Sequence, residues 1–227
     1  MRNDLTELVF IVDRSGSMNS IREAAIGSFN KFLEDQKKGP GEVQVTLVLF
    51  DHEYNMLYSG IPIDAADELD ATTFVPRGNT ALFDAIGRTI NEVGSRLAQT
   101  ADRDRPGSVV VAILTDGNEN ASREFDAQEI KGMIEEQESK YSWVFAYLSA
   151  DKDAISDAGK IGIARNMTHQ FSANTQDYAK SCGFMSEYAT RHRGAMLTSA
   201  DPLEVKKSMS LQDVVQDCAS DDDSDDS

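Results

Sequence analysis

The stretch Leu8-Val9-Phe10-Ile11-Val12-Asp13-Arg14-Ser15-Gly16-Ser17 decides the fold of this chain of 227 residues. Its apolar half is typical of a strand that is buried on both faces of a parallel sheet. A carboxylate follows at the end of the strand, with two hydroxyls at alternate positions of an extended loop. Alternate residues of an extended chain point the same way, so Ser15 and Ser17 can face one ion. Such hard oxygen ligands suit Mg²⁺ or Mn²⁺ better than zinc.

Two later motifs complete a pattern. Gly78-Asn79-Thr80-Ala81-Leu82 places a threonine at the start of a predicted helix, and Leu114-Thr115-Asp116-Gly117 places a carboxylate after another apolar strand. With these, residues 4–193 resemble the von Willebrand factor type A (VWA) domain and its metal-ion-dependent adhesion site (MIDAS). The family motif, Asp-x-Ser-x-Ser followed by a distant Thr and a distant Asp, is complete here. The residues within and around the motif are similar to those of short cytosolic members from bacteria or phages, not to those of integrins or matrix proteins.

The resemblance implies a three-layer, Rossmann-like α/β fold, with helices on both faces of a mostly parallel sheet that has one antiparallel edge strand. It also implies that Ser15, Ser17 and Thr80 contact a Mg²⁺ or Mn²⁺ ion directly. Asp13 and Asp116 would bind through water or hold the hydroxyls. One exchangeable position would then accept an Asp or Glu carboxylate of a partner. For Thr80, capping of the following helix is an alternative, because threonine is favoured at N-caps.

The order of apolar segments independently indicates an α/β sheet, because strand patterns alternate with helical patterns. The expected strands cover residues 5–12, 43–50, 54–63, 109–114, 141–148 and 167–171. One expected helix begins after residue 20 and a second begins at residue 82. The others cover residues 126–140, 153–161 and 175–193. The link over residues 51–53 is too short for a helical crossover, so we expect an antiparallel hairpin at the sheet edge. Ser20 and Glu23 are expected to form a capping box.

The chain divides, on this interpretation, into a VWA domain at residues 1–193 and a C-terminal tail at residues 194–227. The tail ends in the run 220–227, which consists almost entirely of Asp and Ser. Such a segment buries too little apolar area to offset its ordering entropy. We therefore expect the last third of the tail to be disordered.

Bulk composition narrows the classes of partner. The net charge is −17, which disfavours nucleic acid, since phosphate binding needs a basic face. The two cysteines, Cys182 and Cys218, lie far apart in unlike contexts, which fits a reducing cytoplasm. The sequence has neither a signal-peptide core nor an apolar stretch of about 18 residues. We expect a soluble cytoplasmic protein that binds neither nucleic acid nor membranes.

The leading functional hypothesis is a metal-dependent protein–protein interaction module. The alternative is a regulatory or adaptor subunit of an AAA+ ATPase or of a stress or defence complex, with an operon-encoded partner. In that case the acidic tail would be a docking or autoinhibitory arm, whose carboxylates could reach the metal at high effective concentration. A metal-dependent hydrolase is a third possibility. Only Asp13 and Asp116 could serve as its base, and nucleophile-elbow and phosphate-loop motifs are absent, so we expect no enzyme.

Two residues near the motif have open roles at this stage. Arg14 is expected at the rim, where its charge could steer an acidic side chain or simply be solvated. Glu119 could bend toward the ion or face water.

Overall fold

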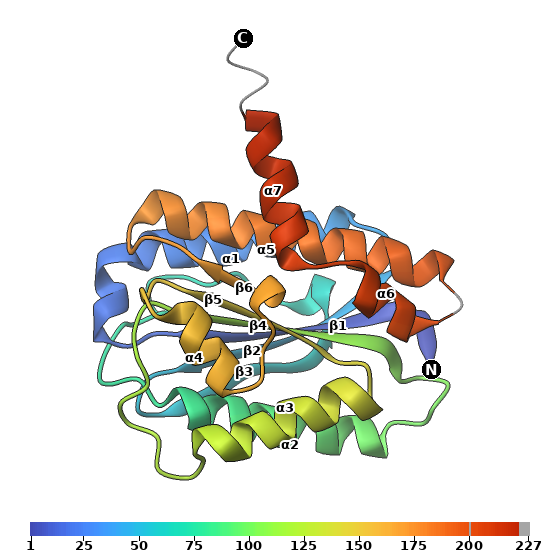
Figure 1. The fold of residues 1–227 in the computed structure, drawn as a ribbon, viewed down its shortest axis with the longest axis horizontal. Helices are drawn as coiled ribbons and strands as arrows, with labels where there is room; N and C mark the ends of the chain where they lie inside the picture. The colour runs from blue at the N-terminus through green and yellow to red at the C-terminus, as the bar shows by residue number, and fades with distance from the viewer. Residues whose placement is uncertain (200, 223–227) are drawn as a thin grey trace.

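The computed structural model describes residues 1–199 and 201–222 as a twisted sheet between two layers of helices (Figure 1). Within these residues the sheet has six strands in the order β3-β2-β1-β4-β5-β6. The β2–β3 pair is antiparallel, and the other neighbouring pairs are parallel. The predicted α/β class and the antiparallel edge strand are therefore confirmed. The strands are β1 (Arg2–Asp13), β2 (Glu42–Phe50), β3 (Tyr54–Pro62), β4 (Pro106–Thr115), β5 (Val144–Ser149) and β6 (Thr168–Gln170).

Two groups of helices cover the faces of the sheet. Figure 1 shows α1 and α5 on one face and α2 and α3 on the other. The helices are α1 (Arg22–Lys38), α2 (Leu82–Gln99), α3 (Ala127–Lys140), α4 (Ala154–Lys160), α5 (Thr175–Thr198), α6 (Pro202–Ser208) and α7 (Leu211–Asp222). Short 3₁₀ turns are η1 (Gly16–Ile21), η2 (Ile63–Ala65) and η3 (Arg165–Met167).

The core explains why β1 lies at the centre of the sheet. All residues of β1 from Leu5 to Asp13 are buried, as are all residues of β4. On the α1 face, Phe10 packs edge-on against Phe29 and Phe32, with ring centroids 5.5 and 4.5 Å apart. A strand that is buried on both faces cannot turn polar side chains to solvent within the sheet, so its functional groups collect at its end.

The start of the first long helix differs from the prediction. The turn η1 occupies Gly16–Ile21, α1 begins only at Arg22, and no side chain caps it. The Ser20 hydroxyl instead donates to the Ser17 carbonyl at 3.2 Å. The predicted capping box of Ser20 and Glu23 is therefore wrong, because the serine motif continues into a 3₁₀ turn.

The C-terminal segment has more regular structure than we expected. Helix α5 continues past residue 193 to Thr198, and α6 and α7 follow it. Leu211 and Val214 are fully buried against the core, and Gln212 Nε2 donates to the carbonyl of Thr168 on the edge strand β6 at 2.5 Å. Helix α7 thus shields part of that edge, which would otherwise offer unpaired backbone groups. The expected disorder does not extend over residues 217–222, which belong to α7; residues 223–227 lie outside the described residues.

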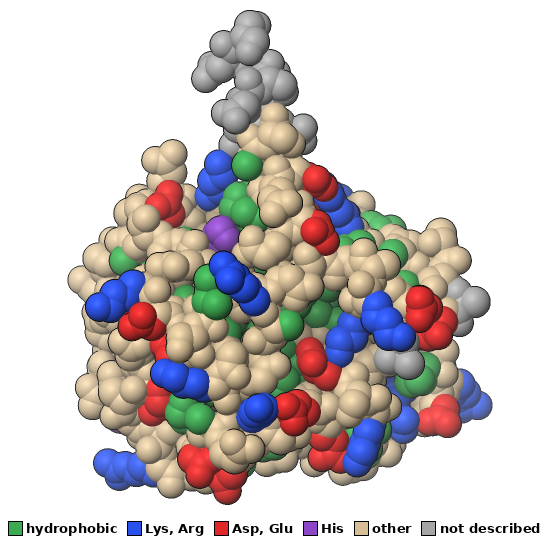
Figure 2. Space-filling view, viewed as in Figure 1, with side chains coloured by type: hydrophobic (Ala, Val, Ile, Leu, Met, Phe, Trp, Pro, Cys, Tyr) green, Lys and Arg blue, Asp and Glu red, His purple; other side chains and the backbone are tan. Residues whose placement is uncertain are grey.

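The face of the molecule that Figure 2 shows is not uniformly acidic. Figure 2 shows acidic and basic side chains interspersed over this face, although the chain as a whole carries a net charge of −17. None of the described helices combines the length and the apolar character needed to cross a membrane.

Candidate metal site

Three loops meet where β1 and β4 end. We call residues 14–20 the serine loop, residues 76–81 the threonine loop and residues 116–126 the aspartate loop. Strands β1 and β4 are neighbours, but the chain continues from β1 to β2 on one side and from β4 to β5 on the other. Open α/β sheets bind ligands at such a reversal, beyond the carboxyl ends of the strands.

Asp13 forms the floor of the site. Its side chain is fully buried, and Oδ1 accepts a hydrogen bond from the Ser15 backbone amide at 2.6 Å. Oδ2 accepts one from the Thr115 hydroxyl at 2.7 Å. The Asp13 carboxylate therefore fixes the turn of the serine loop and joins it to the end of β4.

The remaining predicted residues lie around this floor. The Ser15 and Ser17 hydroxyl oxygens are 3.0 Å apart, and Ser17 Oγ donates to Asp116 Oδ1 at 2.7 Å. A Cβ atom built on Gly117 would lie 3.8 Å from both the Ser17 and the Thr80 hydroxyl oxygens. Gly117 therefore lies beside both hydroxyls, and a side chain there would be in van der Waals contact with them. The structure brings all five predicted residues together; that they bind a metal stays a prediction.

The electrostatics of the site favour a cation. Burial raises the pKa of Asp13 to about 6 despite its hydrogen bonds, and the nearby Asp116 charge adds to the rise. Burial also raises the pKa of Asp116. Two carboxylates that lose solvation beside three neutral hydroxyls form an all-oxygen donor set that fits a hard divalent ion. Within the described residues, no three His, Cys, Asp or Glu side chains gather as a metal cluster, so a site of the usual zinc composition is not formed there.

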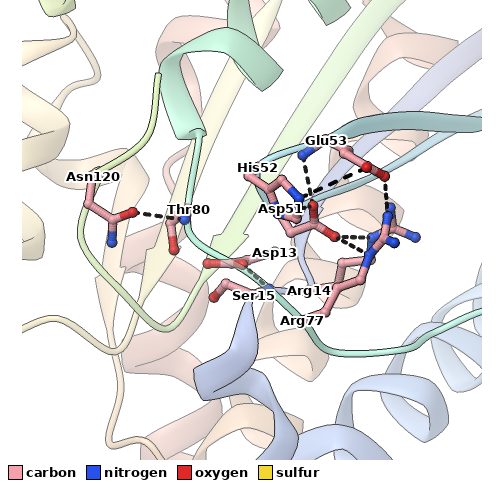
Figure 3. Close-up of polar contacts among 9 residues, drawn as sticks. All are labelled: Asp13, Arg14, Ser15, Asp51, His52, Glu53, Arg77, Thr80 and Asn120. Atoms are coloured by element: carbon pink, nitrogen blue, oxygen red, sulfur yellow. Dashed lines mark hydrogen bonds and ion pairs between the residues drawn. The ribbon is translucent and has the colours of Figure 1, made fainter. Parts of the chain in front are cut away.

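Thr80 does not cap the helix that follows it. Helix α2 has Ala81 as its N-cap residue and no side-chain cap. Glu119 instead accepts a hydrogen bond from the first turn of α2, with its Oε2 3.1 Å from the Phe83 amide. Asn120 holds the backbone of Thr80, with Oδ1 accepting from the Thr80 amide at 3.0 Å. The Thr80 side chain is thereby left to face Asp13 and Ser15, as Figure 3 shows.

Arg14 and Glu119 have roles other than those the sequence suggested. Arg14 is buried, points away from the site, and its Nε donates to Asp51 Oδ2 at 3.0 Å (Figure 3). It is therefore neither a solvated rim residue nor a free cation that could steer a partner. The half-buried Glu119 carboxylate accepts hydrogen bonds from backbone amides of its own loop and of α2.

Sequence reasoning missed three supporting residues. Thr115 was part of a quoted motif, and its place at the end of the strand beside β1 could have indicated its contact with Asp13. Asn120 lies outside the motifs, although it anchors Thr80. Asp51 appeared only as part of a hairpin link, and no sequence signal joins it to Arg14, which lies 37 residues away.

Solved structures with a similar fold include several VWA proteins. Proximal thread matrix protein 1 from the mussel byssus is 16% identical over 82% of this chain and 46% of that protein, with a TM-score of 0.58. A VWA protein from Catenulispora acidiphila is 13% identical over 82% of this chain and 42% of that one, at 0.55. The ArnB paralog VWA2 from Sulfolobus acidocaldarius is 16% identical over 80% and 44%, at 0.52.

The chain thus spans less than half the length of these three proteins, and at such identities the likeness establishes the fold alone. Another crystal of the mussel protein has zinc in its MIDAS motif. No curated protein sequence matches the chain. The family model for the von Willebrand factor type A domain, however, matches residues 7–182. That match spans the central sheet and all three loops of the site, and the chain belongs to the von Willebrand factor type A domain family.

Proposed function

We propose that this chain is a module that binds a protein partner through a divalent metal ion. Ser15, Ser17 and Thr80 would hold the ion through their hydroxyls, with Asp13 and Asp116 behind them. The observation that carries the proposal is the convergence of these five side chains, from the end of β1 and from three separate loops, at one edge of the sheet. The partner would contribute the carboxylate of an Asp or Glu.

The hydrogen bonds of the site prepare the hydroxyls for a cation. Ser17 donates its proton to Asp116 at 2.7 Å and accepts from the Ser15 hydroxyl at 3.0 Å, which leaves its oxygen one lone pair for an ion. The Asp13 carboxylate holds the Ser15 amide at 2.6 Å and so orients the serine loop. When bound, the ion would supply a positive charge that neutral hydroxyls compensate only in part. An anionic side chain of a partner would then complete its coordination.

We propose Mg²⁺ or Mn²⁺ as the ion, because every donor in the set is oxygen. The zinc in the MIDAS motif of the mussel protein supports binding of a divalent ion to a motif of this kind, without identifying the ion used here. We also propose binding rather than catalysis. Asp13 and Asp116 are the only acid–base groups among the five residues, and both are already engaged by hydroxyls that belong to the site or its floor.

Metal binding can be tested by titrating Mn²⁺ and Mg²⁺ into the full chain in a calorimeter. Ser17→Ala removes a hydroxyl that is exposed in the structure, so the fold should tolerate it. We expect one binding site in the wild type and a Kd at least about tenfold weaker in Ser17→Ala. Ser20→Ala is the matched control, because this neighbouring serine donates to a backbone carbonyl instead. A wild type without binding, or equal loss in both variants, would contradict the proposal.

The partner can be sought by affinity capture with the wild type in Mg²⁺, the wild type in EDTA, and Ser17→Ala in Mg²⁺. We expect a protein that is retained only in the first condition. Replacement of its contacting Asp or Glu by Asn or Gln should then abolish the interaction. A partner retained equally in all three conditions would place the binding surface elsewhere.

A further inference from the structure

A fully buried carboxylate lies next to the metal site without belonging to it. Asp51 follows the last residue of β2, and its side chain has no exposed surface. Its Oδ2 accepts from Arg14 Nε at 3.0 Å and from Arg77 Nε at 3.1 Å. Its Oδ1 accepts from the Glu53 amide at 2.7 Å and lies 3.1 Å from His52 Nδ1. Figure 3 shows this cluster beside Asp13, Ser15 and Thr80.

The two arginines come from different loops of the site. Arg14 lies between the floor residue Asp13 and the first hydroxyl ligand candidate, Ser15. Arg77 lies in the threonine loop, three positions before Thr80. One carboxylate oxygen of Asp51 therefore joins the serine loop to the threonine loop.

Backbone contacts make the same connection. The Arg77 amide donates to the Arg14 carbonyl at 2.9 Å, and the Gly16 amide donates to the Gly78 carbonyl at 3.2 Å. The Asp51 carbonyl itself accepts from the Ala81 amide, immediately after Thr80, at 2.8 Å. Asp51 is thus fixed at both its main chain and its side chain to segments that carry hydroxyls of the site.

We propose that Asp51 is a positioning residue, which sets metal affinity by holding the Thr80 hydroxyl at a fixed separation from the Ser15 and Ser17 hydroxyls. The inference rests on the proposed function, since it concerns the same site. An octahedral ion with short metal–oxygen distances tolerates little variation in the spacing of its ligands. A change in the relative position of the two loops should therefore weaken binding without removing any ligand.

Asp51→Asn tests the inference most directly, because it keeps the shape of the side chain and removes its charge. Arg14 then loses the charge of its carboxylate partner, Arg77 keeps only its ion pair with Glu53, and the connection between the loops weakens. We expect the Mn²⁺ Kd of the full chain, measured by calorimetry, to rise at least about tenfold. This variant also makes the surroundings more positive, which by itself would disfavour a cation.

Arg77→Met separates position from charge. Its side chain is about half exposed (47%), so the fold should tolerate the change. The loss of a positive charge near the site should strengthen cation binding if charge alone matters. Loss of the tie to Asp51 should weaken binding if position matters. We expect a weaker Mn²⁺ Kd, opposite to the electrostatic effect.

Glu7→Gln is the matched control. Glu7 is a fully buried carboxylate that pairs with Arg96 and accepts from the Thr46 hydroxyl at 2.7 Å. It lies six residues before Asp13 on β1, hence roughly 20 Å from the site at about 3.3 Å per residue. We expect this variant to lower the thermal midpoint in EDTA and to leave the Mn²⁺ Kd unchanged.

The outcomes separate this inference from the proposed function. Weaker Mn²⁺ binding in both Asp51→Asn and Arg77→Met, with Glu7→Gln unchanged, supports positioning. An Asp51→Asn variant that binds Mn²⁺ with the Kd of the wild type overturns the positioning role alone. Tighter Mn²⁺ binding by Arg77→Met does the same. A wild type that binds neither Mn²⁺ nor Mg²⁺ overturns the proposed function and this inference with it.

Discussion

Asparagine in place of Asp13 should stabilise the metal-free protein while it abolishes metal binding. The carboxylate of Asp13 is fully buried, and burial raises its pKa from an ordinary 3.8 to about 6. Since a tenfold change in proton affinity corresponds to about 1.4 kcal/mol, the ionised side chain costs the folded state about 3 kcal/mol at neutral pH. Asparagine removes this cost because it carries no charge.

The hydrogen bonds of Asp13 should survive the substitution. The asparagine oxygen can accept from the Ser15 amide as Asp13 Oδ1 does at 2.6 Å. Its amide group can donate to Thr115 Oγ1, whose own proton can go to the Gly117 carbonyl 3.0 Å away. We therefore expect most of the electrostatic cost to be recovered, a gain of about 2–3 kcal/mol in the free energy of unfolding.

The difference in stability between Asp13→Asn and the wild type should depend on pH. In the wild type the folded state holds the Asp13 proton more tightly than the unfolded state, so stability falls as pH rises from 3.8 to about 6. Asp13→Asn lacks this loss. Its advantage over the wild type should be near zero below pH 3.8, grow through this window and stay constant above it. Other titrating groups occur in both proteins and cancel in the difference.

Urea unfolding in EDTA, followed by circular dichroism between pH 4 and pH 8, measures this difference. Addition of Mg²⁺ should stabilise only the wild type, by about 2.7 kcal/mol when its concentration is 100 times the Kd. A variant that is no more stable than the wild type at pH 8, or a difference that does not depend on pH, would show that the ionised Asp13 carboxylate does not destabilise the metal-free fold.

Three further predictions concern the frame of the site. Burial lowers the pKa of His192 from 6.5 to about 4, so the free energy of unfolding of the wild type should fall by up to about 3 kcal/mol as pH falls through this range. Urea unfolding of His192→Gln should show no such loss. Asp126→Ala breaks the capping box of α3 and should lower the unfolding free energy by about 1 kcal/mol without altering the Mn²⁺ Kd in calorimetry. Gln36→Leu leaves the Arg193 guanidinium without its Gln36 Oε1 partner at 2.7 Å, and chemical denaturation should show a loss of about 2–3 kcal/mol.

Features that depend on residues close together in the chain could be predicted from the sequence. The apolar run before Asp13 predicted a central strand, and the short link after residue 50 predicted the antiparallel hairpin that β2 and β3 form. The five site residues came from motifs at strand ends, where the topology of a parallel sheet brings them to one edge.

Features that depend on distant partners were not predictable. The role of Arg14 depends on Asp51, which only the register of β1 beside β2 brings within 3.0 Å. The first helix begins late because η1 uses the residues expected to cap it. The cover that α7 gives to β6 depends on a contact between Gln212 and Thr168, 44 residues apart in the chain. Autoinhibition by the acidic tail and a cytoplasmic location stay predictions, and residues 223–227 lie outside the described residues.

The most direct test of the central claim is a crystal of the full chain grown with Mn²⁺ and measured for anomalous scattering. We predict one strong peak within bonding distance of the Ser15, Ser17 and Thr80 hydroxyls, with Asp13 and Asp116 in the surrounding shell. A peak at another position, or no peak at these hydroxyls under saturating Mn²⁺, would contradict metal binding at this site.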